Sequence, residues 1–448
     1  MISARPGAPL VRSVFGVNLE QQGRGFYVPL ELLAITRGVW EADRSQVLDS
    51  AAKVVTYRRA SHDFARRVAV GTEVPPEVLE PAVQGTPTLQ TVRALLSSLI
   101  VEIPGRRQAP KWFAAHLYPF VGELIHYDAV ERRGRPAIER YTFRDGGGWA
   151  YNVLRSDPLT ERRLRTRDEL CRLVGDSGRP LGRVAAALKT HDTAPAQEFP
   201  DSSLQETRVF DDVSPWPEHL RRGVNYIVTR NAVPAAKQIE SLMHWVPYCL
   251  ARHQLHLARA VLDLPRERVL VDATRDTNPL RTRSQELLDE YHKDIANALV
   301  QEAAISRRDA LAAGDIEGAE RLARFAQPGA NFTRSPRAFF SGTLAAVGAL
   351  NSTMGKRHFA FKPPMLEALV AATLEPGHER EYFDFCALAF QEYGLVIDRR
   401  TAETIGLTDD IDAGVFTVNE EAFRARLEAT GLLTHYSDAT SMIHGEPR

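Results

Sequence analysis

The chain has 448 residues, of which 44% are hydrophobic and 25% are charged, as in an ordinary globular protein. This length is too great for one hydrophobic core and predicts about three or four domains. A net charge of −1 excludes a uniformly basic nucleic-acid-binding chain, although it is compatible with a basic patch on one face.

Cysteine usage and apolar runs predict the compartment. Cys171, Cys249 and Cys386 are far apart and odd in number, which predicts neither a disulfide framework nor a paired-cysteine zinc module. The N-terminal segment lacks the apolar stretch of a signal peptide, and other apolar runs are shorter than the ~20 residues that a membrane span requires. We therefore expect a soluble cytoplasmic protein with no membrane partner.

The first half of the chain divides into three predicted parts. Residues 1–135 form a helical domain, because apolar residues recur there at three- and four-residue spacing. In residues 136–191, β-branched and aromatic residues around Gly146–Gly148 predict a β-hairpin. The Arg-rich end of that part predicts a helix-turn-helix or a plain helical hairpin. Residues 192–217, rich in Pro, Ser and Asp, are predicted to be a linker.

A second helical domain is predicted for residues 218–330. It begins with a long helix over 234–264, in which Pro247 is a candidate kink. A short buried strand is predicted at 268–274. Two further helices form a hairpin that turns at Gly314.

Residues 331–448 predict a C-terminal winged-helix-like domain. Three amphipathic helical segments precede a short polar, β-branched tail, which is the element order of a winged helix. The third helix is predicted to start at Asn419 as its N-cap and to end at Gly431. The fold class is therefore mainly α with small β elements: a multidomain helical protein that ends in a winged-helix-like domain.

One helix could bind a metal ion. Cys249, His253 and His256 are spaced to share one helical face, and His244 and Asp263 are near enough in sequence to complete a zinc site. The same spacing is typical of a buried stripe, and leucines surround the three residues. We favour packing, keep zinc as the weaker alternative, and predict no cofactor.

Two further patterns suggest catalysis. Asp272 and Asp276 follow an apolar run, where metal-dependent nucleases often carry their carboxylates. Gly355 and Lys356 suggest a phosphate-binding loop, but the spacing differs from a P-loop and Arg357 replaces its Ser or Thr. We keep the nuclease as an alternative and set the ATPase aside.

Within the predicted C-terminal domain, a basic and aromatic segment at residues 332–362 precedes the three helical segments. Cations on phosphates with aromatic rings beside unpaired bases are typical of nucleic-acid contact. The alternative is a domain junction with a Phe-rich core and solvated cations. The cations are Arg334, Arg337, Lys356, Arg357, His358 and Lys362, and the aromatic residues are Phe332, Phe339, Phe340, Phe359 and Phe361.

The terminal domain departs from a DNA-reading winged helix. The predicted third helix begins with Glu420 and Glu421, which would repel phosphate, and the tail at 434–445 has no Lys or Arg. We therefore expect it to dock on a protein, or to meet DNA through other faces. The predicted nucleic-acid-binding residues are Arg334, Arg337, Lys356, Arg357, Arg399, Arg400 and Arg424.

The segments FCALAFQEYGLVIDRRTAETIG and AFRARLEATGLLTHYSDATSMI resemble the winged-helix-bearing terminal domains of accessory proteins in bacterial anti-phage defence systems. The resemblance covers roughly the last quarter of the chain and includes no catalytic motif. It implies a non-catalytic subunit that works beside nucleases, ATPases or methyltransferases.

Three hypotheses follow. The first is a non-catalytic adaptor that binds protein partners and contacts nucleic acid, DNA rather than RNA, through Arg-rich patches. The second is a metal-dependent nuclease or hydrolase. The third is a protein-interaction scaffold without nucleic-acid contact.

Overall fold

The computed structural model describes residues 7–20, 25, 27–51, 56–59, 112–115, 127–132, 135–138, 145–175, 197–200, 207–351, 356–436 and 440–446. The chain divides into two compact units. Unit 1 comprises Met1–Phe26, Thr207–Val233 and Glu240–Arg448, and unit 2 comprises Tyr27–Glu206 and Pro234–Ile239. The five-part division predicted from the sequence remains a prediction.

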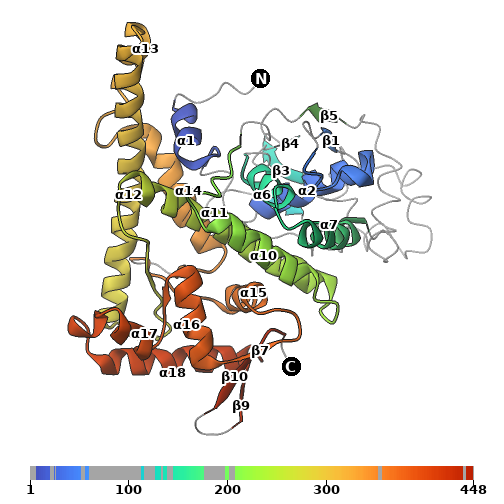
Figure 1. Cartoon of the computed structure of the whole chain (residues 1–448), viewed down its shortest axis with the longest axis vertical. Coiled ribbons are helices and arrows are strands. Elements are labelled where there is room, and N and C mark those ends of the chain that lie inside the picture. Colours follow the sequence, from blue (N-terminus) through green and yellow to red (C-terminus); the bar gives the residue numbers. More distant parts are fainter. Residues whose placement is uncertain are drawn as a thin grey trace. The chain divides into compact units, whose positions relative to one another are not determined.

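The fold is mainly helical, as predicted (Figure 1). The α-helices of the described residues are α1 (Ala8–Phe15), α2 (Tyr27–Ala42), α6 (Gly146–Arg155), α7 (Thr160–Gly175), α10 (Trp216–Val228), α11 (Ala235–Val261), α12 (Pro279–Ala312), α13 (Ile316–Ala323), α14 (Arg334–Ala346), α15 (Pro363–Thr373), α16 (Tyr382–Tyr393), α17 (Arg399–Thr404) and α18 (Ala413–Ala429). The strands are β1 (Thr56–Arg59), β2 (Trp112–Ala115), β3 (Tyr127–Arg132), β4 (Arg135–Ile138), β5 (Gln197–Pro200), β6 (Val269–Leu270), β7 (Glu379–Glu381), β8 (Leu395–Val396), β9 (Leu433–His435) and β10 (Ser441–His444).

In unit 2 the predicted β-hairpin around the triple glycine is wrong. Gly146 begins α6, and the hairpin of this region lies upstream, where β3 pairs with β4. A Cβ atom on Gly147 would lie 2.4 Å from the Glu31 Cβ and 2.5 Å from the Leu32 backbone nitrogen of α2. The glycine therefore allows α6 to approach α2 closely, which local sequence patterns do not reveal.

The predicted linker includes regular structure. Strand β5 pairs antiparallel with β1, and α10 begins at Trp216, whose side chain is fully buried. Upstream, α7 is the first helix of the predicted helix-turn-helix segment, while its second half, residues 176–191, lies outside the described residues.

The predictions for the middle of unit 1 are confirmed. Helix α11 runs through Pro247. Helices α12 and α13 are joined through Gly314, whose φ of +78° suits glycine. Strand β6 pairs in parallel with β8, so the segment after α11 is joined to the residues from 363 onward, here called the terminal region. Apolar side chains from both regions form one core: Leu270, Leu280, Val396, Ala402, Ile411 and Phe416.

The terminal region ends in helix α18 and the β9–β10 hairpin, and its sheet has the order β7-β10-β9 (Figure 1). The predicted start of the last helix is wrong. Asp412 is its N-cap and accepts a hydrogen bond from the Gly414 backbone nitrogen, so α18 begins six residues before Asn419. Asn419 is buried inside the helix, and Glu420 and Glu421 lie along it rather than at its positive end.

Of the helices in the described residues, none has both the length and the apolar content needed to cross a bilayer.

Candidate nucleic-acid interface

Four of the predicted cations lie on two neighbouring segments of unit 1. Arg334 and Arg337 are in the first turn of α14, and Lys356 and Arg357 are exposed in the loop that follows it. Burial lowers the pKa of His292, and the charges of Arg337 and Arg357 lower it further, so both segments lie close to the same ring. Within the described ranges, none of the four cations forms an ion pair. Their charges are therefore available to an anion.

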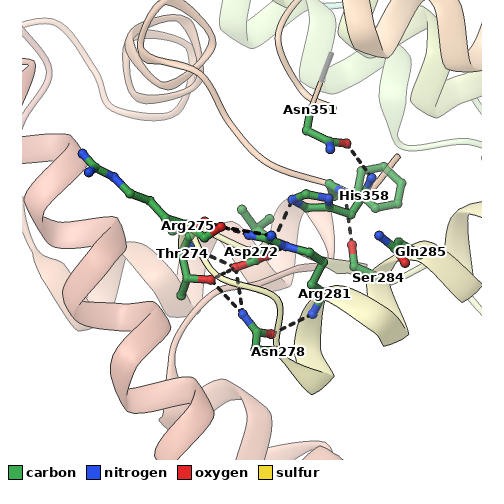
Figure 2. Close-up of polar contacts among 12 residues, drawn as sticks. Asp272, Thr274, Arg275, Asn278, Arg281, Ser284, Gln285, Asn351 and His358 are labelled. Atoms are coloured by element: carbon green, nitrogen blue, oxygen red, sulfur yellow. Dashed lines mark hydrogen bonds and ion pairs between the residues drawn. The ribbon is translucent and has the colours of Figure 1, made fainter. Parts of the chain in front are cut away.

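A hydrogen-bond network fixes the loop that carries Lys356 and Arg357 (Figure 2). The His358 backbone nitrogen donates to the Asn351 Oδ1 at 2.8 Å, and Leu350 bridges Phe359 in antiparallel fashion. From α12, the Gln285 side chain donates to the Lys356 carbonyl at 3.3 Å. The loop is therefore held against α12 by backbone contacts, which leaves the side chains of Lys356 and Arg357 facing solvent.

The buried carboxylate of Asp272 lies at the centre of this network (Figure 2). It accepts hydrogen bonds from the Thr274 backbone nitrogen at 2.9 Å, from the Thr274 hydroxyl at 2.6 Å and from the Arg281 Nε at 2.6 Å. Burial raises the pKa of Asp272, but the bonds from Thr274 and Arg281 outweigh it, so the net pKa is lowered. Asp276 joins the cluster through its backbone carbonyl. The Asp272 carboxylate is therefore already occupied by hydrogen bonds from Thr274 and by its ion pair with Arg281.

His358 contributes no charge to the surface at neutral pH. Its ring is buried, with Nε2 3.6 Å from the Asp272 Oδ2. Burial lowers the pKa of His358, and the charges of Arg281 and Arg426 lower it further, against the opposing effect of Asp272. The imidazole therefore belongs to the buried network and not to the exposed cations.

The aromatic half of the predicted interface is wrong. Phe339, Phe340, Phe359 and Phe361 are buried in the core, as the junction alternative proposed. Phe332 alone of the predicted five is half-buried, and its ring lies 5.0 Å from that of Phe325. The four buried rings cannot stack on bases.

The three predicted arginines of the terminal region each have a partner within the protein. Arg399 pairs with Glu403 at 2.6 Å. Arg424 pairs with Glu420 at 3.0 Å, and its guanidinium lies 4.2 Å from the ring centre of Tyr382. The guanidinium of the third, Arg400, lies over the ring of Phe383 at 3.6 Å. These side chains support the packing of the terminal region, in contrast to the four cations of the first set.

The candidate metal ligands have separate partners. Cys249 and His253 are fully buried, and the His253 Nδ1 lies 2.9 Å from the Ser214 hydroxyl. Burial raises the pKa of the Cys249 thiol and lowers that of His253 to about 3. The His256 Nδ1 lies 3.1 Å from the Glu267 carboxylate. Across the described part of the chain, no three His, Cys, Asp or Glu side chains gather as a metal site.

A buried ion pair between α11 and the segment that follows it was not predicted. Arg252 and Glu267 are both fully buried, with 3.2 Å between the guanidinium and the carboxylate. Tyr248 accepts a hydrogen bond from Arg252 at 2.8 Å, and Trp216 lies 4.7 Å beneath the guanidinium. An arginine within an apolar helix was the signal for such a partner, because an unpaired charge is too costly to bury.

Comparisons with protein-family models, with curated proteins and with solved structures found no match.

Proposed function

We propose that this protein is a non-catalytic adaptor that binds the backbone of duplex DNA through Arg334, Arg337, Lys356 and Arg357, here called the 334–357 cations. The observation that carries the proposal is that none of the four has an acidic partner among the described residues. Arg334 and Arg337 lie on α14, and Lys356 and Arg357 lie on a loop whose backbone is held by hydrogen bonds from Gln285 and to Asn351. Exposed cations held in fixed positions can neutralise successive phosphates and release counterions.

The contact is with phosphates and not with base edges. The rings of Phe339, Phe340, Phe359 and Phe361 are unavailable for stacking, so the surface favours a regular duplex over an unpaired strand. Binding of this kind is independent of sequence and falls steeply with salt.

The terminal region serves as the protein-docking part of the adaptor. Its three-stranded sheet and preceding helices support a winged-helix-like domain. Its predicted nucleic-acid contacts Arg399, Arg400 and Arg424 are paired or stacked rather than presented to DNA. The proposed cytoplasmic setting within an anti-phage defence complex rests on the resemblance of residues 385–406 and 422–443.

A salt titration of duplex DNA binding tests the proposal. The double substitution Lys356→Ala with Arg357→Ala removes two phosphate contacts, so the slope of log K against log salt decreases by up to about two, on any DNA sequence. Arg334→Ala with Arg337→Ala has the same effect.

The matched control removes the same charge from the terminal region. Arg399→Ala with Arg400→Ala leaves the slope and the affinity unchanged. Equal losses in both double variants show that total charge, and not the 334–357 cations, governs binding. Tighter binding of duplex RNA than of duplex DNA contradicts the choice of DNA.

A further inference from the structure

Unit 1 contains a cavity of about 390 Å³, within the usual size range of small-ligand sites. It lies between the start of α1, the segment after α1, the end of α13 and the start of α14. Its lining includes Asn18, Glu20, Arg324, Phe325, Asn331 and Phe332.

Two aromatic rings form one wall of the cavity. Phe325 and Phe332 are half-buried, and their rings meet edge to face with 5.0 Å between centres. Gly7 makes room for this wall, because a Cβ atom on it would lie 2.9 Å from the Phe332 ring. Unlike the four buried phenylalanines, these rings face an open volume and can pack against a flat ligand ring.

The charged groups of the lining restrict the ligand. Arg324 is exposed, and its guanidinium lies 4.8 Å from the centre of the Phe325 ring. The carboxylate of Glu20 is buried and accepts a hydrogen bond from Asn18 at 3.2 Å. One cation and one anion favour a ligand with a single negative group and disfavour a triphosphate, which the carboxylate would repel.

The start of α14 connects the cavity to the proposed DNA surface. Ser335 and Pro336 line the cavity, and in the chain they stand between Arg334 and Arg337. The same first turn of α14 therefore contributes to both surfaces, with the cavity-lining Ser335 and Pro336 on other sides of the helix than the two arginines. The amides of Asn18 and Asn331 can both donate and accept hydrogen bonds at the edge of a base.

We propose that the cavity binds one nucleotide unit, with the base against Phe325 and Phe332 and a single phosphate on Arg324. The inference deepens and rests on the proposed DNA contact, and it specifies an unpaired nucleotide at the end of a duplex as the ligand. Stacking on aromatic rings typically accounts for a large part of the binding of an unpaired base.

Binding of free nucleoside monophosphates tests the cavity by itself. Calorimetry detects binding of AMP or GMP to the full chain, and Arg324→Gln and Phe325→Ala each weaken it by about tenfold or more, the loss expected for one base stack or one charged contact. Arg308→Gln is the matched control, because it removes an exposed charge from α12 outside the cavity, and it leaves binding unchanged. Thermal denaturation establishes that each variant is folded.

Three results overturn the inference: no binding of either monophosphate, tighter binding of ATP than of AMP, or equal binding of a free aromatic amino acid.

Duplex DNA with and without a short overhang separates this inference from the function on which it rests. Both hold if the overhang strengthens binding and Phe325→Ala abolishes only that gain. If blunt and overhanging duplexes bind alike with the same salt slope, the cavity inference fails and the proposed function stands. If AMP binds in the cavity but no duplex binds, the proposed function fails instead.

Discussion

Two sets of cationic side chains in unit 1 differ in whether they have acidic or aromatic partners among the described residues. Arg399 and Arg424 have carboxylates within 3.0 Å, and Arg400 stacks on a ring. Lys356 and Arg357 are exposed on a loop that is fixed through its backbone. If the proposed function holds, phosphate is bound by cations that have no acidic partner among the described residues, and not wherever arginine is dense along the chain.

The two sets differ in the free energy needed to bind a phosphate. A phosphate that approaches Arg424 must displace Glu420 or share the guanidinium with it, and it must also compete with the contact to Tyr382. A phosphate that approaches Arg357 has no ion-pair partner to displace among the described residues, and the release of counterions favours binding. Four experiments test whether the two sets of cations differ in this way.

The largest expected effect follows from Asp272→Asn. The change leaves Arg281 without its charge partner in a buried network and lowers the free energy of unfolding by about 3 kcal/mol. DNA binding weakens as well, because the loop at Lys356 is held by the same network. Chemical denaturation and a DNA titration measure the two effects. Asp276→Asn is the control, with a change within about 0.5 kcal/mol; equal losses would show that Asp272 is not the anchor.

Acid is expected to destabilise the fold through buried histidines. Burial lowers the pKa of His219 and of His253 to about 3, against an ordinary value of 6.5. Between these pH values the unfolded chain binds more protons than the folded one. The free energy of unfolding therefore decreases as the pH is lowered from 6.5 to about 3. Each histidine contributes about 1.4 kcal/mol per pH unit.

Urea denaturation at several pH values measures this slope. His253→Asn reduces it by about one proton, while Lys356→Ala leaves it unchanged. A slope that is identical in the wild type and in His253→Asn would remove the buried ring from the explanation.

Single substitutions separate the two sets of arginines. Arg424→Ala loses a half-buried ion pair and an aromatic contact, which lowers the free energy of unfolding by about 1–2 kcal/mol without changing DNA affinity. Arg357→Ala changes stability by less than about 0.5 kcal/mol and lowers the salt slope by about one. Thermal denaturation and a salt titration on each variant check both statements, and a reversed pattern contradicts the contrast.

The smallest expected effect comes from releasing a paired cation. Glu403→Gln frees Arg399 on the exposed face of α17. If counterions decide the outcome, the variant binds DNA a few-fold more tightly and its salt slope increases by up to about one. Glu320→Gln, which removes an equal exposed charge that forms no ion pair among the described residues, serves for comparison. No change in either variant would show that position, and not pairing, distinguishes Arg399 from Arg357.

Periodic segments of the chain were predictable. The long α11, the hairpin of α12 and α13 and strand β6 follow from apolar spacing and from Gly314, because these signals act over a few neighbouring residues. The triple glycine was misread because its reason is tertiary, namely the backbone of α2 lying against Gly147. Asn419 was predicted to be an N-cap, but its role is also tertiary. Its side chain bonds the backbone of three residues on other segments, which local sequence patterns do not reveal.

The candidate interface was predictable only in part. The sequence identified Lys356 and Arg357 as cations in a loop, but it did not distinguish them from Arg399, whose partner Glu403 is four residues away on the same short helix. That i to i+4 spacing was a readable signal of pairing. The burial of Phe359 depends on core contacts, and Asp272 is fixed by partners from three segments, so neither could be derived locally.

Asn419 gives the terminal region a mechanical property. Its side chain accepts a hydrogen bond from the Ala273 backbone nitrogen at 2.7 Å and donates to the carbonyls of Val271 at 2.9 Å and Ile397 at 2.8 Å. Helix α18 therefore cannot turn or slide against the β6–β8 pair without breaking three buried bonds together. A displacement of α18 is therefore transmitted to Val271 and Ala273, the two residues that flank Asp272.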